Sequence, residues 1–155
     1  MFTREDFQQL ARTSLANPRF VAGYRGLHYS TYPQYAFQVP DSEQTLRITR
    51  APKAAADNGL GFWLAAESVD FTPQRERYFA PYLADAAFAP LSEPALLKQI
   101  ADCCAELIQP PPLPLISDQT FQGALLMYSL DTDLLVSLFA EYSQEYLHFY
   151  WTSTA

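Results

Sequence analysis

The sequence predicts one α+β domain, residues 1–155, with two to four helices packed on a mainly antiparallel sheet of about five to six strands. Apolar residues make up 49% of the chain and aromatic residues 15%, enough to form a buried core at this length. Some segments have helical spacing of apolar residues, and others have the alternation of strands. In the first half of the chain, several predicted strands follow one another without an intervening helix. Because a doubly wound parallel sheet requires strict alternation of strands and helices, this order favours antiparallel strands.

A helix opens the chain, and a series of short strands follows it. Thr3 is placed to cap the helix with Asp6 in its first turn, and apolar residues then recur at helical spacing up to Asn17 and Pro18. Farther on, apolar and β-branched residues come in short runs separated by turn-forming residues. These runs predict strands over residues 24–30, 34–39, 45–50 and 60–67. Residues 68–91 show no clear period.

The second half contains the clearest periodic segment, a helix predicted over residues 92–108. Ser92 supplies its cap, and the apolar face includes Cys104, with Cys103 at the edge of that face. The prolines of residues 110–114 predict an extended connector, and residues 120–130 then read as a buried strand.

The C-terminal end combines an acidic helix start with an alternating strand. Asp131 and Asp133 are typical of a first helical turn, so a helix is predicted from there through Tyr142. Residues 145–152 alternate and predict a strand with two different faces. One face carries Leu147, Phe149 and Trp151, and the other carries Tyr146, His148 and Tyr150.

The charge is distributed unevenly along the chain. Residues 1–77 contain nine Lys and Arg against eight Asp and Glu, a net charge of +1, whereas residues 78–155 contain one against nine, a net charge of −8. Nucleic acids and anionic membrane surfaces attract the opposite charge, so neither is predicted as a partner. An acidic field of this kind attracts a basic protein.

The cysteines and the N-terminus predict a cytoplasmic location. Cys103 and Cys104 are the only cysteines, and adjacent residues do not form an ordinary structural disulfide with each other. The N-terminus has early acids and lacks the apolar stretch of a signal peptide.

No motif in the sequence predicts a catalytic residue, a metal site or a cofactor. The acids at Asp131 and Asp133 have the spacing of a metal–phosphate motif, but a role in helix capping is favoured because no basic phosphate clamp lies nearby. The two histidines, His28 and His148, lack zinc-site spacing, and His148 is expected to be a hydrogen-bonded residue of a sheet face.

The sequence therefore favours a non-catalytic protein-binding domain that neutralises a basic partner, as toxin-immunity proteins do. Tyrosines beside carboxylates are typical of interfaces, since they bury a large area and keep a polar group. The predicted contact residues are Asp131, Asp133, Glu141, Glu145, Tyr146 and Tyr150. The alternatives are a binding protein resembling secretion chaperones, which would expose an apolar groove, and a small enzyme whose site forms only in the folded chain.

Overall fold

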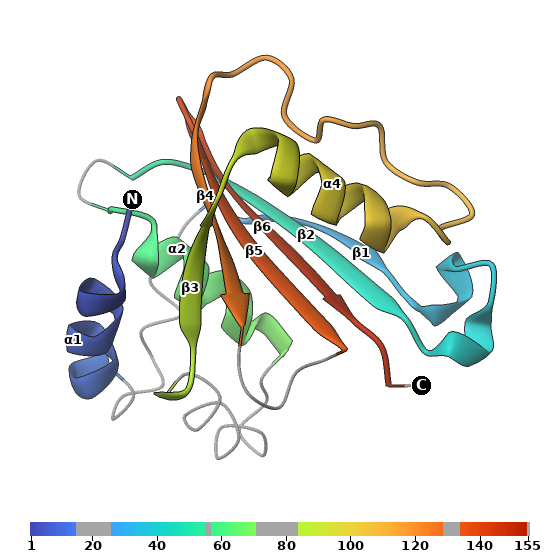
Figure 1. Ribbon diagram of the computed structural model, residues 1–155, viewed down its shortest axis with the longest axis horizontal. Helices are drawn as coiled ribbons and strands as arrows, with labels where there is room; N and C mark the ends of the chain where they lie inside the picture. Colours follow the sequence, from blue (N-terminus) through green and yellow to red (C-terminus); the bar gives the residue numbers. More distant parts are fainter. Residues whose placement is uncertain (15–25, 55–56, 71–83, 129–133, 155) are drawn as a thin grey trace.

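The computed structural model describes residues 1–14, 26–54, 57–70, 84–128 and 134–154, which form an antiparallel sheet with three α-helices packed against it (Figure 1). The strands lie in the order β1-β2-β6-β5-β4-β3, and each neighbouring pair is antiparallel. Their bounds are His28–Tyr32 (β1), Thr45–Pro52 (β2), Ala87–Leu91 (β3), Phe121–Tyr128 (β4), Leu135–Tyr142 (β5) and Glu145–Thr152 (β6). The predicted α+β class with an antiparallel sheet is confirmed.

The helices cover both faces of the sheet. The helices α1 (Arg4–Ser14) and α2 (Leu60–Glu67) contribute to the core on one face, and α4 (Glu93–Cys104) packs on the other. Three short 3-10 turns complete the described elements: η2 (Gln34–Ala36), η3 (Pro40–Ser42) and η4 (Ser68–Asp70). None of the helices in the described ranges is long and apolar enough to cross a membrane.

The caps predicted for α1 and α4 are present. The Thr3 backbone N–H donates to Asp6 Oδ2 at 3.0 Å, and the Asp6 N–H donates back to Thr3 Oγ1 at 3.2 Å. Ser92 accepts the Ala95 N–H at the start of α4. Strands β2, β4 and β6 also lie where the sequence predicts strands. The local signals in these segments were therefore sufficient.

Leu60–Glu67 forms α2, so the strand predicted there is wrong. The Asp57 carboxylate starts the helix by accepting the backbone N–H groups of Gly59, Gly61 and Phe62 at 3.1 to 3.3 Å. Every residue from Phe62 to Glu67 is buried, so the helix shows no polar face. A short, largely apolar run such as Leu60 to Ala66 fits a buried strand and a buried helix equally well.

The helix predicted from Asp131 through Tyr142 is also wrong, because Leu135–Tyr142 forms the strand β5. Asp131 and Asp133 themselves lie outside the described residues. From Leu135 the chain pairs with β4 on one side and with β6 on the other. This strand is buried on both faces, with Leu138 in the core under α4 and Phe139 in the core under α2. Apolar residues on both faces hide the alternation that usually identifies a strand.

The two remaining strand predictions are partly corrected. The predicted strand at residues 24–30 is β1, which begins at His28, whereas residues 24 and 25 lie outside the described ranges. The predicted strand at residues 34–39 is instead η2 followed by one isolated bridge between Phe37 and Leu107. This bridge connects the β1–β2 region to the end of α4.

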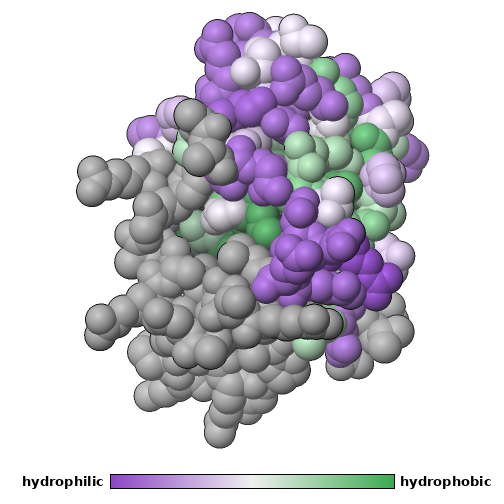
Figure 2. Space-filling view, turned by 90° about the vertical axis from the view of Figure 1, so that its left-hand side faces the viewer, coloured by the Kyte–Doolittle hydropathy of each residue, from purple (hydrophilic) through white to green (hydrophobic). Residues whose placement is uncertain are grey.

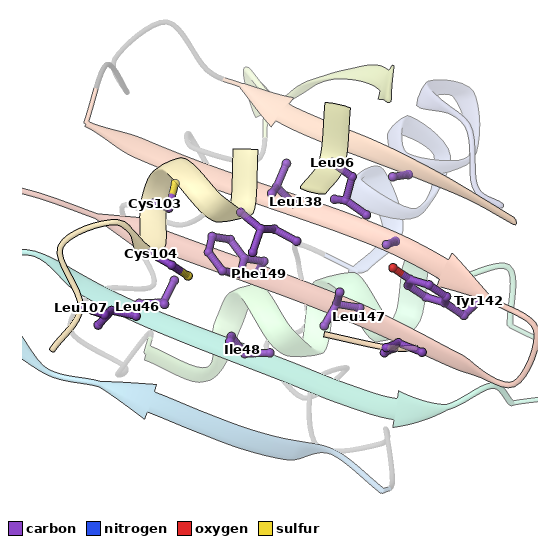
Figure 3. Close-up of a cluster of buried hydrophobic side chains, with 14 of the residues drawn as sticks. Leu46, Ile48, Leu96, Cys103, Cys104, Leu107, Leu138, Tyr142, Leu147 and Phe149 are labelled. Atoms are coloured by element: carbon purple, nitrogen blue, oxygen red, sulfur yellow. The ribbon is translucent and has the colours of Figure 1, made fainter. Parts of the chain in front are cut away.

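The core under α4 contains both cysteines (Figure 3). Cys104 packs among apolar residues of α4 and the sheet, and Cys103, which the sequence places at the edge of the apolar face, is buried as well. The alternation predicted for β6 is confirmed here, because Leu147 and Phe149 point to this core.

Aromatic rings dominate the core between α1, α2 and β3. Phe2, Phe7, Trp63 and Phe88 pack against one another with ring centroids 5.2 to 6.3 Å apart. The outer surface on this side of the molecule is mixed, with hydrophobic groups lying between hydrophilic ones (Figure 2). The packing of these rings shows that much of the aromatic content lies inside the protein.

Candidate functional site

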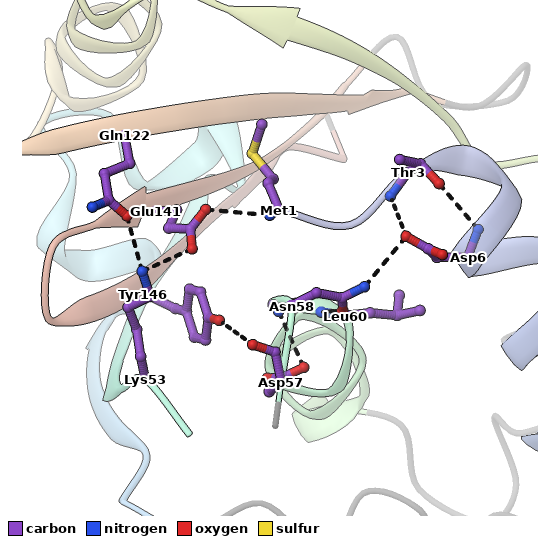
Figure 4. A network of polar contacts seen from close by, with 11 residues as sticks. Met1, Thr3, Asp6, Lys53, Asp57, Asn58, Leu60, Gln122, Glu141 and Tyr146 are labelled. Carbon is purple, nitrogen blue, oxygen red and sulfur yellow. Dashed lines mark hydrogen bonds and ion pairs between the residues drawn. The ribbon is translucent and has the colours of Figure 1, made fainter. Parts of the chain in front are cut away.

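Two of the six predicted contact residues, Asp131 and Asp133, lie outside the described ranges, and a third, Glu141, forms ion pairs within the chain. Glu141 Oε1 lies 2.8 Å from Lys53 Nζ, and its Oε2 lies 3.5 Å from the amino group of Met1 (Figure 4). Its side chain is only 13% exposed. The charge of Glu141 is thus largely offset by the N-terminal part of the chain.

Glu145 is held in a similar way on the neighbouring strand. Arg50 donates to both carboxylate oxygens, from Nε at 3.0 Å and from a terminal nitrogen at 2.9 Å, and Gln119 donates a further hydrogen bond at 2.9 Å. The hydrogen bond from Arg50 lowers the pKa of Glu145 below its ordinary value. This carboxylate is already engaged on two sides.

The two predicted tyrosines differ in their surroundings. Tyr146 has 0% of its surface exposed, and its hydroxyl donates to the backbone oxygen of Asp57 at 2.7 Å. A partner therefore has no access to Tyr146 in this structure. Tyr150 is half-buried, and its ring contacts the Arg47 guanidinium, 5.1 Å from the ring centroid, and stacks with the ring of His148.

A buried polar cluster lies under the C-terminal end of α2. Glu67, Ser137 and His148 form its centre, and all three are almost completely buried. Glu67 Oε1 accepts the Ser137 hydroxyl and lies 2.9 Å from His148 Nε2. Arg47 donates to the backbone oxygen of Ala66 at 2.8 Å, close to the helix end. The prediction that His148 is a hydrogen-bonded residue of a sheet face is confirmed.

The Glu67, Ser137 and His148 cluster lacks the geometry of a catalytic triad. In a triad the histidine bridges nucleophile and acid through its two different nitrogens. Here His148 Nε2 faces both Glu67, at 2.9 Å, and the Ser137 hydroxyl, at 3.4 Å, while the Ser137 proton is directed to the carboxylate. The arrangement gives the Ser137 hydroxyl, the Glu67 carboxylate and His148 Nε2 hydrogen-bond partners and pins α2 to the sheet.

The cysteines do not form a nucleophilic site either. Burial raises the pKa of Cys103 to about 12 and that of Cys104 to about 11. Both thiols therefore stay protonated at neutral pH, where the thiolate is the reactive form. Among the described residues, no group of three or more His, Cys, Asp or Glu side chains is arranged to hold a metal ion.

A different surface lies where η2 meets the end of α4 (Figure 1). It contains an open pocket of about 260 Å³, lined by Tyr32, Ala36, Ile108 and Gln109. Backbone hydrogen bonds join its two sides, from Gln38 to the Glu106 oxygen at 2.8 Å and from Ile108 to the Ala36 oxygen at 3.0 Å. Here the chain exposes large apolar side chains: Tyr35 (78%), Ile108 (59%) and Val39 (51%).

Acidic residues accompany this pocket. Asp41 and Glu43 follow Val39 at the η3 turn. Glu106 directly precedes Leu107, which forms the bridge to Phe37. All three acids are exposed. We call the pocket residues, Tyr35, Val39 and these three acids the α4-end surface. The sequence does not predict this surface, because residues 34–39 read as a strand and residues 92–108 as one continuous helix. The local sequence signal for this surface is the placement of Tyr35 and Val39 beside the acids Asp41 and Glu43.

No protein-family model matches this chain, and no curated protein or solved structure matches it either.

Proposed function

We propose that this chain is a non-catalytic protein-binding domain that neutralises a basic protein partner, in the manner of a toxin-immunity protein, and that the α4-end surface makes the contact. One observation carries the proposal: exposed acids lie beside an open pocket and beside large apolar side chains that the fold leaves uncovered. Interfaces combine these features, because apolar contact supplies affinity while charge orients the partners.

The location of the acids refines the sequence-based choice of contact residues. Glu141 and Glu145 are paired with Lys53 and Arg50, so little of their charge is available to a partner. Asp41, Glu43 and Glu106 are exposed, and their contacts in the described residues are hydrogen bonds from neutral groups, Thr154 to Glu43 and Gln44 to Glu106. Such contacts leave the negative charge in place, which supports a contact at the α4-end surface.

The test begins with a partner captured from the native host on the immobilised protein, identified and then purified. The association rate of the two proteins should fall as ionic strength rises, because salt screens attraction between opposite charges. Reversing Asp41, Glu43 and Glu106 to lysine should slow association by about tenfold or more at low salt.

A matched variant makes this test specific. Reversing Glu5, Asp85 and Asp118 to lysine changes the net charge equally at three other exposed positions. This variant should lose clearly less of the association rate than the variant of the α4-end surface. A rate that does not depend on salt, equal losses in the two variants, or turnover of a small molecule by the purified chain would contradict the proposal.

A further inference from the structure

The pocket of the α4-end surface has the size of a site for protein side chains. Its volume of about 260 Å³ lies below the roughly 300–1,000 Å³ of pockets that enclose drug-sized ligands. Three of its four lining residues, Tyr32, Ala36 and Ile108, present mainly apolar surface, and Gln109 adds an amide at one side. A large apolar side chain fits this combination of size and chemistry.

The walls of the pocket are held in place before any partner arrives. The bridge between Phe37 and Leu107 fixes η2 against the end of α4, and both of these side chains are anchored in the core under α4. Backbone hydrogen bonds on either side of the bridge fix the relative position of Ala36 and Ile108. A preformed pocket reduces the ordering cost that binding has to overcome.

A residue of the kind that dominates binding energy lies beside a lining residue in the chain, since Tyr35 directly precedes Ala36. Tyr35 is 78% exposed, and Ile108 remains 59% exposed although it also lines the pocket. Tyrosine is enriched among residues whose truncation strongly weakens protein complexes, particularly beside a pocket that is filled by the partner.

The charge around the pocket identifies the partner's chemistry. Asp41, Glu43 and Glu106 are exposed acids, and the one cation of α4, Lys98, already pairs with Asp102 at 2.8 Å. A second copy of this chain is disfavoured as the occupant, because a symmetric contact would bring the same acids face to face. Lysine or arginine on the partner would instead be attracted.

We infer that the pocket between Tyr32, Ala36 and Ile108 receives one large apolar side chain of the basic partner, flanked in the partner by lysine or arginine. This inference rests on the proposed function and adds the recognition chemistry. The apolar side chain is the anchor, and the flanking cations pair with Asp41, Glu43 and Glu106 of the α4-end surface.

A library of random linear peptides, displayed on phage and selected on the folded protein, tests the inference directly. Selected peptides should contain a large apolar residue with lysine or arginine nearby. Their affinity, measured with synthetic peptides, should fall by about tenfold or more in both Ile108→Ser and Tyr35→Ala. Because both side chains are largely exposed, the variants should keep the fold, which thermal unfolding checks. Tyr128→Ala removes an exposed tyrosine of β4 and should leave binding unchanged.

The outcomes separate the inference from the function on which it rests. Basic peptides that need no apolar residue and bind Ile108→Ser normally would overturn the anchor and leave the basic-partner function standing. Apolar peptides without cations that still require Ile108 would overturn both. Loss of self-association in Ile108→Ser, seen by sedimentation, would assign the pocket to a second copy and overturn the inference.

Discussion

The acids associated with the sheet and the acids of the α4-end surface carry the same charge in opposite settings. Glu67, Glu141 and Glu145 each contact a histidine, a lysine or an arginine, and each is buried or partly buried. Asp41 and Glu106 are exposed, and near them the chain leaves Tyr35 uncovered. The charges of the first group are offset within the fold, while those of the second group remain exposed at the surface.

This difference shows that net charge by itself does not locate a binding surface. The acids of residues 78–155 outnumber the bases by eight, yet Glu141 and Glu145 from that half have cationic partners in the N-terminal half. The partners decide which charges remain free to act on another molecule. Four variants test the difference between the paired and the exposed acids.

The largest effect is expected from Glu67→Ala, at the centre of the buried cluster. The substitution leaves the Ser137 hydroxyl and His148 Nε2 without the carboxylate, and stranded buried polar groups should lower the free energy of unfolding by about 3 kcal/mol. Urea unfolding measures this change. Glu67→Gln keeps the side-chain shape and an oxygen acceptor and should lose clearly less. Equal losses in the two variants would mean that the negative charge of the carboxylate, and not its packing or a single acceptor oxygen, holds the cluster.

Glu141→Lys should have the next largest effect. It places a third cation beside Lys53 and the amino group of Met1 in a site that is only 13% exposed, and we expect a loss of about 2 kcal/mol. The charge swap that combines Glu141→Lys with Lys53→Glu is the control, and it should recover part of the loss in urea unfolding. No recovery would show that the ion pair with Lys53 contributes little to stability.

The sequence was sufficient wherever one local period was visible. The helix from Glu93 to Cys104 and the strand from Glu145 to Thr152 each have one clear period, so both could be predicted. The helix α2 and the strand β5 are buried on all sides, so tertiary packing decides between helix and strand there.

The candidate site was less accessible to sequence reasoning. Ala36 and Ile108 come together beside the bridge between Phe37 and Leu107, a contact between distant parts of the chain. The partners of Glu141 and Glu145 are equally distant in sequence. Whether an acid is paired or free therefore depends on strand register, which the residues near it do not encode.

The substitution Glu145→Gln tests the third of the paired acids through the pH dependence of stability. The pKa of Glu145 in the folded protein lies below its ordinary value of 4.5, so the carboxylate contributes stability above that pH and loses it as pH falls through the lowered pKa. The difference in unfolding free energy between wild type and variant should therefore be constant near neutral pH and shrink in acid. Urea unfolding at several pH values measures it. In an Arg50→Gln background the pH-dependent difference should be smaller, and an unchanged difference would contradict the role of Arg50.

The smallest effect on stability is expected from the double variant Asp41→Lys and Glu43→Lys. Both residues are exposed at a surface turn, and exposed charges contribute little to folding, so the unfolding free energy should change by less than about 0.5 kcal/mol. Urea unfolding alongside Glu141→Lys provides the comparison. A loss as large as that of Glu141→Lys would mean that these acids also serve the fold. The double variant should also associate more slowly with the proposed basic partner. In that case charge reversal at the exposed acids affects binding and not stability, whereas charge reversal at Glu141 affects stability. The exposed acids would then act in binding and the paired acids in folding.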